Sequence, residues 1–374
     1  MAAACKETAI LAPPEVLARV SDRVQRVIPP RNVRESRSLA AVGESVLAYL
    51  PDTVFELTAA QAAACARTAA LVNGPRAVEV LRGYADDPRP EVLAELVRAW
   101  QYFDPESYAR QVLADAPLAA HRAEVHTGAV PHLHLLRNLR RCSVDLWMDD
   151  DAAGSVRSLS ALTRLRELQL VGNSAPGTLA ELVSLQNLET LWISMFRGWP
   201  SELPFLAELP RLRFLGLAQT RGVEDFSFLR ALSELRTIWI THGVWSRWVE
   251  QVAEPGNLDA AALGLVSDSS ELARATERFG NLHDLVLYHA EALRDLRPLR
   301  ALPLEGVSFD HCGHVDLRAL AAHPTVRDIR IDGRSKIDLT PIADMNVTVT
   351  LHGPDSAVGV ENLGPDVRVR RVRR

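Results

Sequence analysis

The sequence predicts an α/β repeat protein, in which an N-terminal α-helical segment is followed by a solenoid built on a parallel, concave sheet. Two observations support this prediction. Apolar residues recur at three- and four-residue spacing from residue 14 to about 116, as they do on one face of a helix. From residue 165 onward a leucine pattern instead returns at a nearly constant interval, which is typical of a repeat array. We therefore expect an α-helical domain over 1–118, a connection over 119–135 and a repeat domain over 136–374.

The helical part contains segments with helical spacing that are separated by short breakers such as Asn73-Gly74-Pro75. The first predicted helices cover 14–28, 38–50 and 58–72. Within 86–115, Asp-Pro precedes one apolar segment and Asp-Pro-Glu-Ser precedes the next, and both are typical helix starts. The sequence therefore predicts antiparallel helix pairs, which resemble HEAT-type repeats.

The repeat part shows its pattern clearly in LRELQL at 165–170, where three leucines are spaced as L-x-x-L-x-L. Copies follow at LETLWI (188–193), LRFLGL (212–217), LRTIWI (235–240), AAALGL (260–265), LHDLVL (282–287), LEGVSF (304–309) and VRDIRI (326–331), with worn copies at 139–144 and 346–351. Successive first positions lie 22 to 25 residues apart, within the period of about 20–29 residues of leucine-rich repeats. Each copy is expected to form one short parallel strand whose leucines point into the core.

The segments between the strands share an Asp followed by an apolar residue, which begins a short turn. This feature occurs in 223–232, 293–302, 315–323 and 337–345. It resembles the 22-residue class of leucine-rich repeat found in internalin-like proteins, and the resemblance implies short helical or 3₁₀ structure on the convex side. The longest interval, 241–259, is predicted to form a true helix with Trp245, Trp248 and Val252 on one face.

The positions between the leucines are expected to form the concave face, because side chains alternate along a strand. The central positions read Gln169, Trp192, Gly216, Trp239, Gly264, Val286, Ser308, Arg330 and Thr350. Trp192 and Trp239 are two strands apart, about 10 Å at the usual strand spacing, with Gly216 between them and Phe214 one column away. This arrangement predicts a slot for a partner's side chain or helix, because aromatic residues supply much of the energy of protein interfaces. The alternative is that the rings lie over the glycines and fill space in the repeat itself.

The C-terminal half of the same face is predicted to be acidic. A basic segment of a partner would suit this face, while solvated charge that keeps the surface soluble is the alternative explanation. The predicted partner-binding residues are Trp192, Phe214, Trp239, Asp284, Tyr288, Asp310, Asp328, Arg330 and Asp332.

The densest group of chemically reactive side chains is DHCGH, residues 310–314. His242, His289 and His311 share one position of the repeat. His289 and His311 stand in adjacent repeats, so they could bind a metal ion with Cys312 or Asp310 as a further ligand, or a neighbouring histidine could activate the thiolate of Cys312. The alternative is that Cys312 is a small core residue and that loop histidines align because the repeat aligns every position. We predict no catalytic residue, cofactor or metal, and His289, His311 and Cys312 are the main candidates for one.

Composition and charge restrict the classes of partner. A net charge of −5 provides no general attraction to nucleic acid or anionic membrane, and no apolar run approaches the length of about 20 residues that spans a bilayer. No G-x-x-x-x-G-K-[ST] phosphate loop is present. The end VRVRRVRR, 367–374, reads as an edge strand protected by arginine, with contact to nucleic-acid phosphates as the alternative. Four scattered cysteines indicate a reducing compartment, so the cytoplasm is expected.

The helical segment 55–117, followed directly by leucine-rich repeats, resembles the C-terminal part of actinobacterial NACHT proteins. These are signal-transduction (STAND) ATPases related to the NOD-like receptors. The resemblance implies a sensor whose repeats meet a trigger, often during phage defence, and an ATPase or effector that acts in cis or in trans. Because the phosphate loop is missing, the chain is expected to be part of a longer protein or a relative with the recognition part alone.

The predicted function is a non-enzymatic recognition module that binds a protein ligand on the concave face. A stand-alone scaffold is one alternative. A metal-dependent enzyme that uses His289, His311 and Cys312 is the other.

Overall fold

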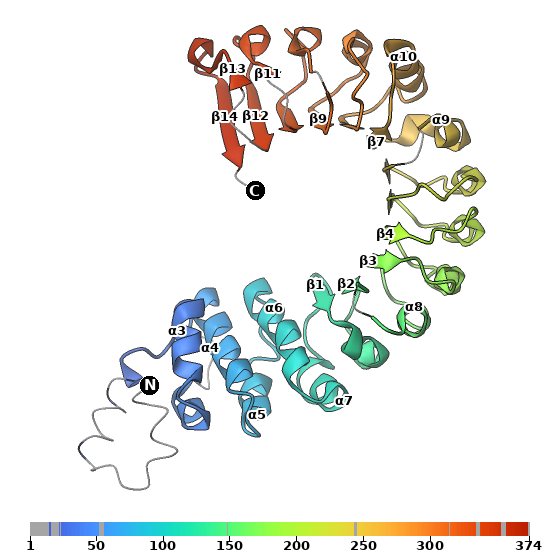
Figure 1. Ribbon diagram of the computed structural model, residues 1–374. Helices are drawn as coiled ribbons and strands as arrows, with labels where there is room; N and C mark the ends of the chain where they lie inside the picture. Colours follow the sequence, from blue (N-terminus) through green and yellow to red (C-terminus); the bar gives the residue numbers. More distant parts are fainter. Residues whose placement is uncertain are drawn as a thin grey trace. The chain divides into compact units, whose positions relative to one another are not determined.

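The computed structural model describes residues 15, 22, 24–51, 56–147, 149–242, 245–313, 315–333, 337–352 and 357–372. Its contacts separate two compact units, Met1–Gln169 and Leu170–Arg374 (Figure 1). The domain limits expected from the sequence, near 118 and 135, stay a prediction, because compactness does not show which segments fold independently. Most of the helix predicted over 14–28 lies outside the described residues.

The first unit begins with short helices. Its described α-helices include α3 (Val33–Ala40), α4 (Ala59–Val72), α5 (Ala77–Arg82), α6 (Pro90–Ala99), α7 (Pro105–Tyr108) and α8 (Ala152–Ser160), and α7 continues as a π-helical turn, Ala109–Leu113. Thr58 and Gln61 form a capping box at the start of α4, and Asn73 ends this helix in the left-handed conformation. The continuous helix predicted over 38–50 is wrong, because Gly43, at a φ of 87°, separates α3 from a 3₁₀ helix, Glu44–Tyr49. Helix α5 was not predicted.

One parallel sheet follows the chain, and every strand lies next to its predecessor. The twelve strands are β1 (Arg122–Val125), β2 (Arg141–Asp145), β3 (Glu167–Ser174), β4 (Thr190–Arg197), β5 (Phe214–Ala218), β6 (Thr237–Ile240), β7 (Ala260–Gly264), β8 (Asp284–Tyr288), β9 (Gly306–Asp310), β10 (Asp328–Asp332), β12 (Val347–His352) and β14 (Val367–Val372). The short strands β11 (Ile337–Asp338) and β13 (Ala357–Val358) form a separate pair. Each copy of the leucine pattern supplies buried side chains, as Leu212, Leu215 and Leu217 do around β5. The predicted leucine-rich-repeat solenoid is confirmed.

The segments between the strands of the second unit are mostly 3₁₀ turns, on the side of this unit opposite its strands (Figure 1). They include Leu179–Ser184, Pro204–Glu208, Ser227–Ala231, Arg297–Ala301, Leu317–Ala319 and Thr340–Ile342, with one longer helix, α10 (Ser269–Arg278). The recurrent aspartate has a local role, because its carboxylate accepts the backbone N–H two residues later. The distances are 2.8 Å at Asp225, 2.9 Å at Asp295, 3.0 Å at Asp316 and 2.9 Å at Asp338. This bond fixes the turn that starts each 3₁₀ segment.

The longest interval contains the predicted buried face but a shorter helix than expected. Trp245, Trp248 and Val252 are all buried, which confirms the face. Helix α9 covers only Trp245–Trp248 and passes into 3₁₀ turns, because Val252 is extended and Pro255 cannot continue an α-helix.

The predicted alignment of the copy at 260–265 is two residues too late. Trp239 lies opposite Ala262 in the neighbouring strand, so the repeat reads LDAAAL from Leu258, with Ala261 at a position where most copies have leucine. Leu258 and Ala261 are buried, whereas Leu265 is 43% exposed. Gly264 therefore leaves the central column of the face, and Ala262 takes its place.

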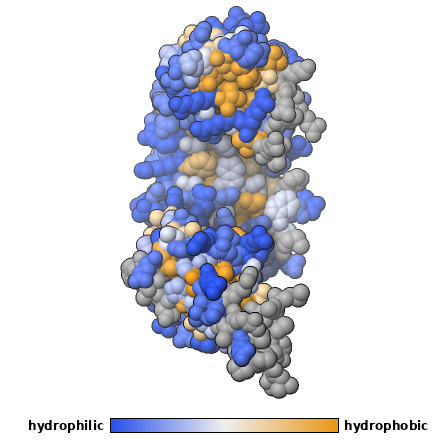
Figure 2. All heavy atoms as spheres, turned by 90° about the vertical axis from the view of Figure 1, so that its left-hand side faces the viewer, coloured by the Kyte–Doolittle hydropathy of each residue, from blue (hydrophilic) through white to orange (hydrophobic). Residues whose placement is uncertain are grey.

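Strand β14 lies at the edge of the sheet, as predicted for Val367–Val372; residues 373 and 374 lie outside the described part. The arginines of β14 are exposed, and Val367 and Val369 are only half-buried. Figure 2 shows apolar atoms gathered at this end of the second unit, where Val358 and Val372 are exposed. None of the described helices is long and apolar enough to cross a lipid bilayer.

Candidate functional site

The exposed face of the repeat sheet carries three parallel rows of side chains, because every second residue of each strand points to this side. The first row runs through Thr190, Phe214, Thr237, Ala260, Asp284, Gly306 and Asp328. The central row runs through Trp192, Gly216, Trp239, Ala262, Val286, Ser308 and Arg330. The third row ends in Gly264, Tyr288, Asp310, Asp332 and His352.

The two tryptophans of the central row touch each other across Gly216. Their ring centroids are 5.7 Å apart with an interplanar angle of 65°, an edge-to-face contact, so the rings lean together although their strands are two steps apart, as predicted. A Cβ atom on Gly216 would lie 2.0 Å from Cε3 of Trp192, which shows that the indole covers the glycine. Phe214 joins the cluster at 6.1 Å from Trp192. The predicted open slot is therefore filled by the rings, which still remain partly exposed.

Next to this cluster lies a cavity of about 390 Å³, which we call the central groove. The surface is hollowed here because the side chains that follow Trp239 in the central row are small. They are Ala262, Val286 and Ser308. Other lining residues are Trp192, Ala218, Gln219, Thr241, His242, Tyr288, Phe309, Asp310, Arg330, Asp332 and His352. Its volume is within the range of about 300–1,000 Å³ that is usual for ligand pockets.

Carboxylates border one side of the central groove. Asp310 and Asp332 occupy neighbouring positions on β9 and β10, and Tyr288 precedes them in the same row. Burial raises the pKa of the Tyr288 phenol, and the two carboxylates raise it further. Arg330 also lines the groove, but its guanidinium pairs with Asp328 at 3.0 Å.

The structure therefore assembles part of the predicted set in one place. Trp192, Trp239, Tyr288, Asp310, Arg330 and Asp332 all line the central groove. Phe214, Asp284 and Asp328 belong to the first row and do not line it. The sequence reading missed His352 and Thr241 as lining residues. The signal for His352 was available, because it stands opposite Asp332 once the last repeats are aligned.

A column of left-handed residues follows the third row where the strands end. The φ angles are 67° at Gln219, 59° at His242, 58° at Leu265, 51° at His289 and 51° at His311. Histidine is among the residues that accept this conformation more readily than most, which gives a structural reason for three histidines at one repeat position. The alignment of these histidines, inferred from the sequence, is confirmed.

These histidines form a stack beside the groove. The ring centroids of His242 and His289 are 5.4 Å apart, and those of His289 and His311 are 5.1 Å apart. The Tyr288 hydroxyl lies 3.4 Å from Nε2 of His242. Burial lowers the pKa of His242, and the neighbouring His289 and Arg221 lower it further. The neutral imidazole of His242 is therefore favoured.

Cys312 does not join the histidines, so the proposed three-residue metal or thiolate site is wrong. Its thiol is buried and donates to the backbone carbonyl of Leu287 at 3.4 Å, inside the repeat. Burial raises the pKa of this thiol to about 11, the opposite of what a nucleophile needs. No group of three metal ligands occurs among the described residues, and His314 lies outside them.

Leu265 is the one aliphatic member of the five-residue left-handed column, and its strain can be tested. Replacing Leu265 by Asn is expected to stabilise the protein by about 0.5–1 kcal/mol, because a branched side chain is unfavourable at positive φ and asparagine tolerates it. Urea denaturation followed by circular dichroism measures the difference. The control is Val183→Asn on an exposed right-handed 3₁₀ turn, where no stabilisation is expected. Equal effects of the two substitutions would contradict the strain argument.

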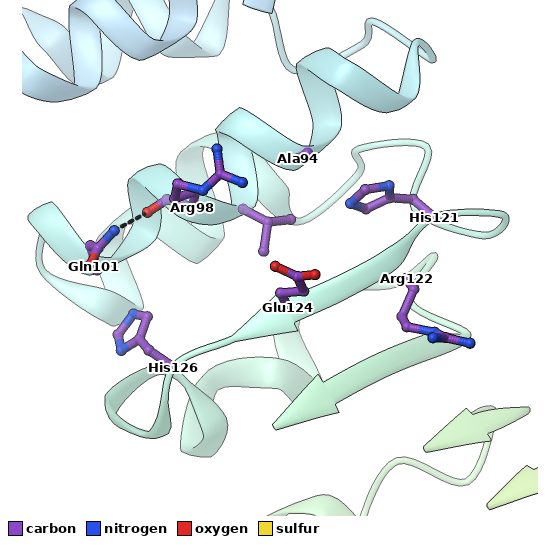
Figure 3. A pocket seen from close by; sticks show the side chains of 8 residues that line it. Ala94, Arg98, Gln101, His121, Arg122, Glu124 and His126 are labelled. Carbon is purple, nitrogen blue, oxygen red and sulfur yellow. Dashed lines mark hydrogen bonds between the residues drawn. The ribbon is translucent and has the colours of Figure 1, made fainter. Parts of the chain in front are cut away.

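The first unit has a smaller cavity, about 180 Å³, between α6 and β1 (Figure 3). Figure 3 shows Glu124 of β1 and His121, which directly precedes this strand, across the cavity from α6, which carries Arg98. Burial lowers the pKa of both His121 and His126. The two arginines of this cavity are held by other carboxylates, Arg98 by Glu95 and Arg122 by Glu167. No sequence pattern indicated this cavity.

Several solved structures are similar to this chain. An internalin from Listeria monocytogenes has 18% identity, covers 75% of this chain and 74% of its own, and has a TM-score of 0.35. The complex of TLR13 with ssRNA13 has 16% identity, covers 64% of this chain and 40% of that chain, and has a TM-score of 0.42. A leucine-rich-repeat protein of Leptospira interrogans has 12% identity, covers 74% and 88%, and has a TM-score of 0.32. No protein-family model matches the sequence, and no curated protein matches it.

Proposed function

We propose that this chain is a non-enzymatic recognition module that binds a polypeptide partner in the central groove. The observation that supports this most is the combination of partly exposed indoles with a cavity of about 390 Å³ on one face. Partly exposed tryptophans beside a pocket are typical energetic centres of protein interfaces. The described residues offer no group of metal ligands, and the single cysteine near the groove is buried, so nothing there favours a catalytic role.

Removing the two indoles is expected to weaken partner binding. Peptides can be selected from a random displayed library against the whole protein, and their affinity measured for the variant with Trp192→Ala and Trp239→Ala. We expect a loss of at least about 2 kcal/mol, or roughly 30-fold in Kd, because hot-spot tryptophans contribute on this scale.

The matched control is Trp147→Ala, which removes an equally large and 44% exposed indole outside the central groove. This variant should bind the selected peptides as the parent protein does. Circular dichroism must show that all variants keep their fold. Peptide affinity that survives the double substitution in a folded protein would reject the groove as the recognition site.

The proposed setting of the module is the sensor part of a NACHT-type signalling ATPase, with a role such as phage defence. Its support is the order of the segments, helices 55–117 directly before the repeats, which resembles that family. An immunoblot of source cells with an antibody to the repeat unit tests this setting. A band far above 41.2 kDa that also binds ATP would support an ATPase in cis. A band at that mass, with no ATPase recovered by cross-linking and pull-down, would contradict the setting.

A further inference from the structure

We infer that the side chain received by the central groove is an arginine of the partner polypeptide, with its guanidinium beside Asp310 and Asp332. This inference rests on the proposed function and adds the chemistry of the anchor residue. It follows from the charge, the shape and the aromatic content of the groove.

The charge of the groove selects a cation. Asp310 and Asp332 stand on adjacent strands, about 4.8 Å apart at the backbone. Arg330, the arginine that lines the groove, pairs with Asp328 of the first row, and Arg221 acts on Tyr288 and His242 from beside it. One oxygen of Asp310 contacts Nδ1 of His311, which leaves its second oxygen for a further contact. The two carboxylates would repel an anionic side chain.

An uncharged apolar side chain fits this end of the groove poorly. It would cover Asp310 and Asp332 and remove charged carboxylates from water without supplying a hydrogen-bond donor, which is costly. A guanidinium supplies five N–H donors in a planar fork that matches carboxylate oxygens. It therefore compensates both carboxylates from one position.

The shape of the groove accommodates the rest of the arginine. Ala262 and Val286 provide an apolar floor for the aliphatic stem, next to the indole of Trp239. Tyr288 stands between this floor and the carboxylates, and its ring offers a face for a guanidinium. Arginine stacks on aromatic faces and is hydrated more weakly than lysine, so it is the better match for this surface.

The test uses a random displayed peptide library and the whole protein. Selection on the parent protein should enrich one arginine position with apolar neighbours. Replacing that arginine by citrulline, which has nearly the same shape but no charge, should weaken binding at least 30-fold. Against the variant with Asp310→Asn and Asp332→Asn, the same replacement should change binding less than threefold, because the charge has lost its partners.

The matched control protein carries Glu208→Gln and Glu277→Gln. These two exposed carboxylates lie on the linking segments, so the control has the same net charge as the test variant but an intact groove. It should bind the arginine peptide within threefold of the parent protein. An equal loss in the control would assign the effect to net charge and overturn the inference.

Three other outcomes are decisive. Peptides without a cationic position that still require Trp192 and Trp239 would overturn the arginine inference and leave the recognition function intact. An arginine-to-lysine peptide that binds equally well would overturn the assignment to a guanidinium. Peptides that bind the parent protein and the Trp192→Ala, Trp239→Ala variant equally would reject the proposed function itself.

Discussion

Replacing Trp248 by alanine is expected to lower the free energy of unfolding of the repeat unit by about 3–5 kcal/mol. Trp248 is fully buried and stacks on Phe279 with ring centroids 6.0 Å apart. It fills the space under residues 241–259, between β6 and β7, where short turns replace a continuous helix. Urea denaturation monitored by circular dichroism measures the loss.

A second substitution separates packing from hydrogen bonding at Trp248. The indole N–H is buried and has no hydrogen-bond partner among the described residues, so Trp248→Phe keeps the stack and removes a costly polar group. We expect Trp248→Phe to cost less than half of what the alanine variant costs. A loss below about 1 kcal/mol for Trp248→Ala would show that the neighbouring segments collapse into the space.

Acidification from pH 7.5 to pH 5 is expected to weaken binding of the arginine peptide about 1.5- to 5-fold. Histidine is the side chain whose charge ordinarily changes between pH 5 and 8. Protonation of His242 adds a positive charge to the lining of the groove that holds the guanidinium. About 0.2–1 kcal/mol for one exposed charge pair corresponds to a change of this size.

The direction of this pH effect follows from the protonation state of the protein that binds the peptide more tightly. The cationic peptide prefers neutral imidazoles, so protons compete with it and affinity falls as the pH falls. Burial, His289 and Arg221 lower the pKa of His242, although Asp310 opposes them. This imidazole therefore takes up its proton at a lower pH than an ordinary histidine. The groups that face it are Tyr288, His289, His311, Asp310 and Arg221.

The matched variant for the pH experiment replaces all three histidines by asparagine. Asparagine also accepts the left-handed backbone of these positions, so the turns should persist without a titrating group. Fluorescence anisotropy of a labelled peptide at each pH gives the affinities. An undiminished pH dependence in the triple variant would assign the effect to other groups.

The repeat fold could be predicted from the sequence because its signal is the burial of leucine at fixed spacing, which many positions repeat. Prediction failed where one position departed from the pattern. Ala261 replaces a core leucine, and Leu265, which looks like a core residue, is an exposed residue of the left-handed column. Leucine content alone therefore placed the copy two residues too late. Gly43 was overlooked in the same way, because one positive φ interrupts an otherwise helical pattern.

The candidate site was predictable in its residues but less so in its geometry. Strand alternation was enough to place Trp192, Trp239 and the two groove aspartates on one face. The spacing of strands could not show that the indoles lean together across Gly216, since this depends on side-chain rotation. The direction of Cys312 was equally hidden, because a residue just after a strand can turn to either side.

The indole of Trp192 lying on Gly216 also restricts the order in which this surface can change during evolution or design. Any side chain at position 216 collides with the ring while Trp192 keeps its present orientation. The tryptophan can be replaced first at the cost of an uncovered glycine, and position 216 then becomes open to substitution. If position 216 is substituted first, the new side chain must displace the indole of Trp192. A new binding preference on this face is therefore reached most readily through the loss of the old aromatic anchor.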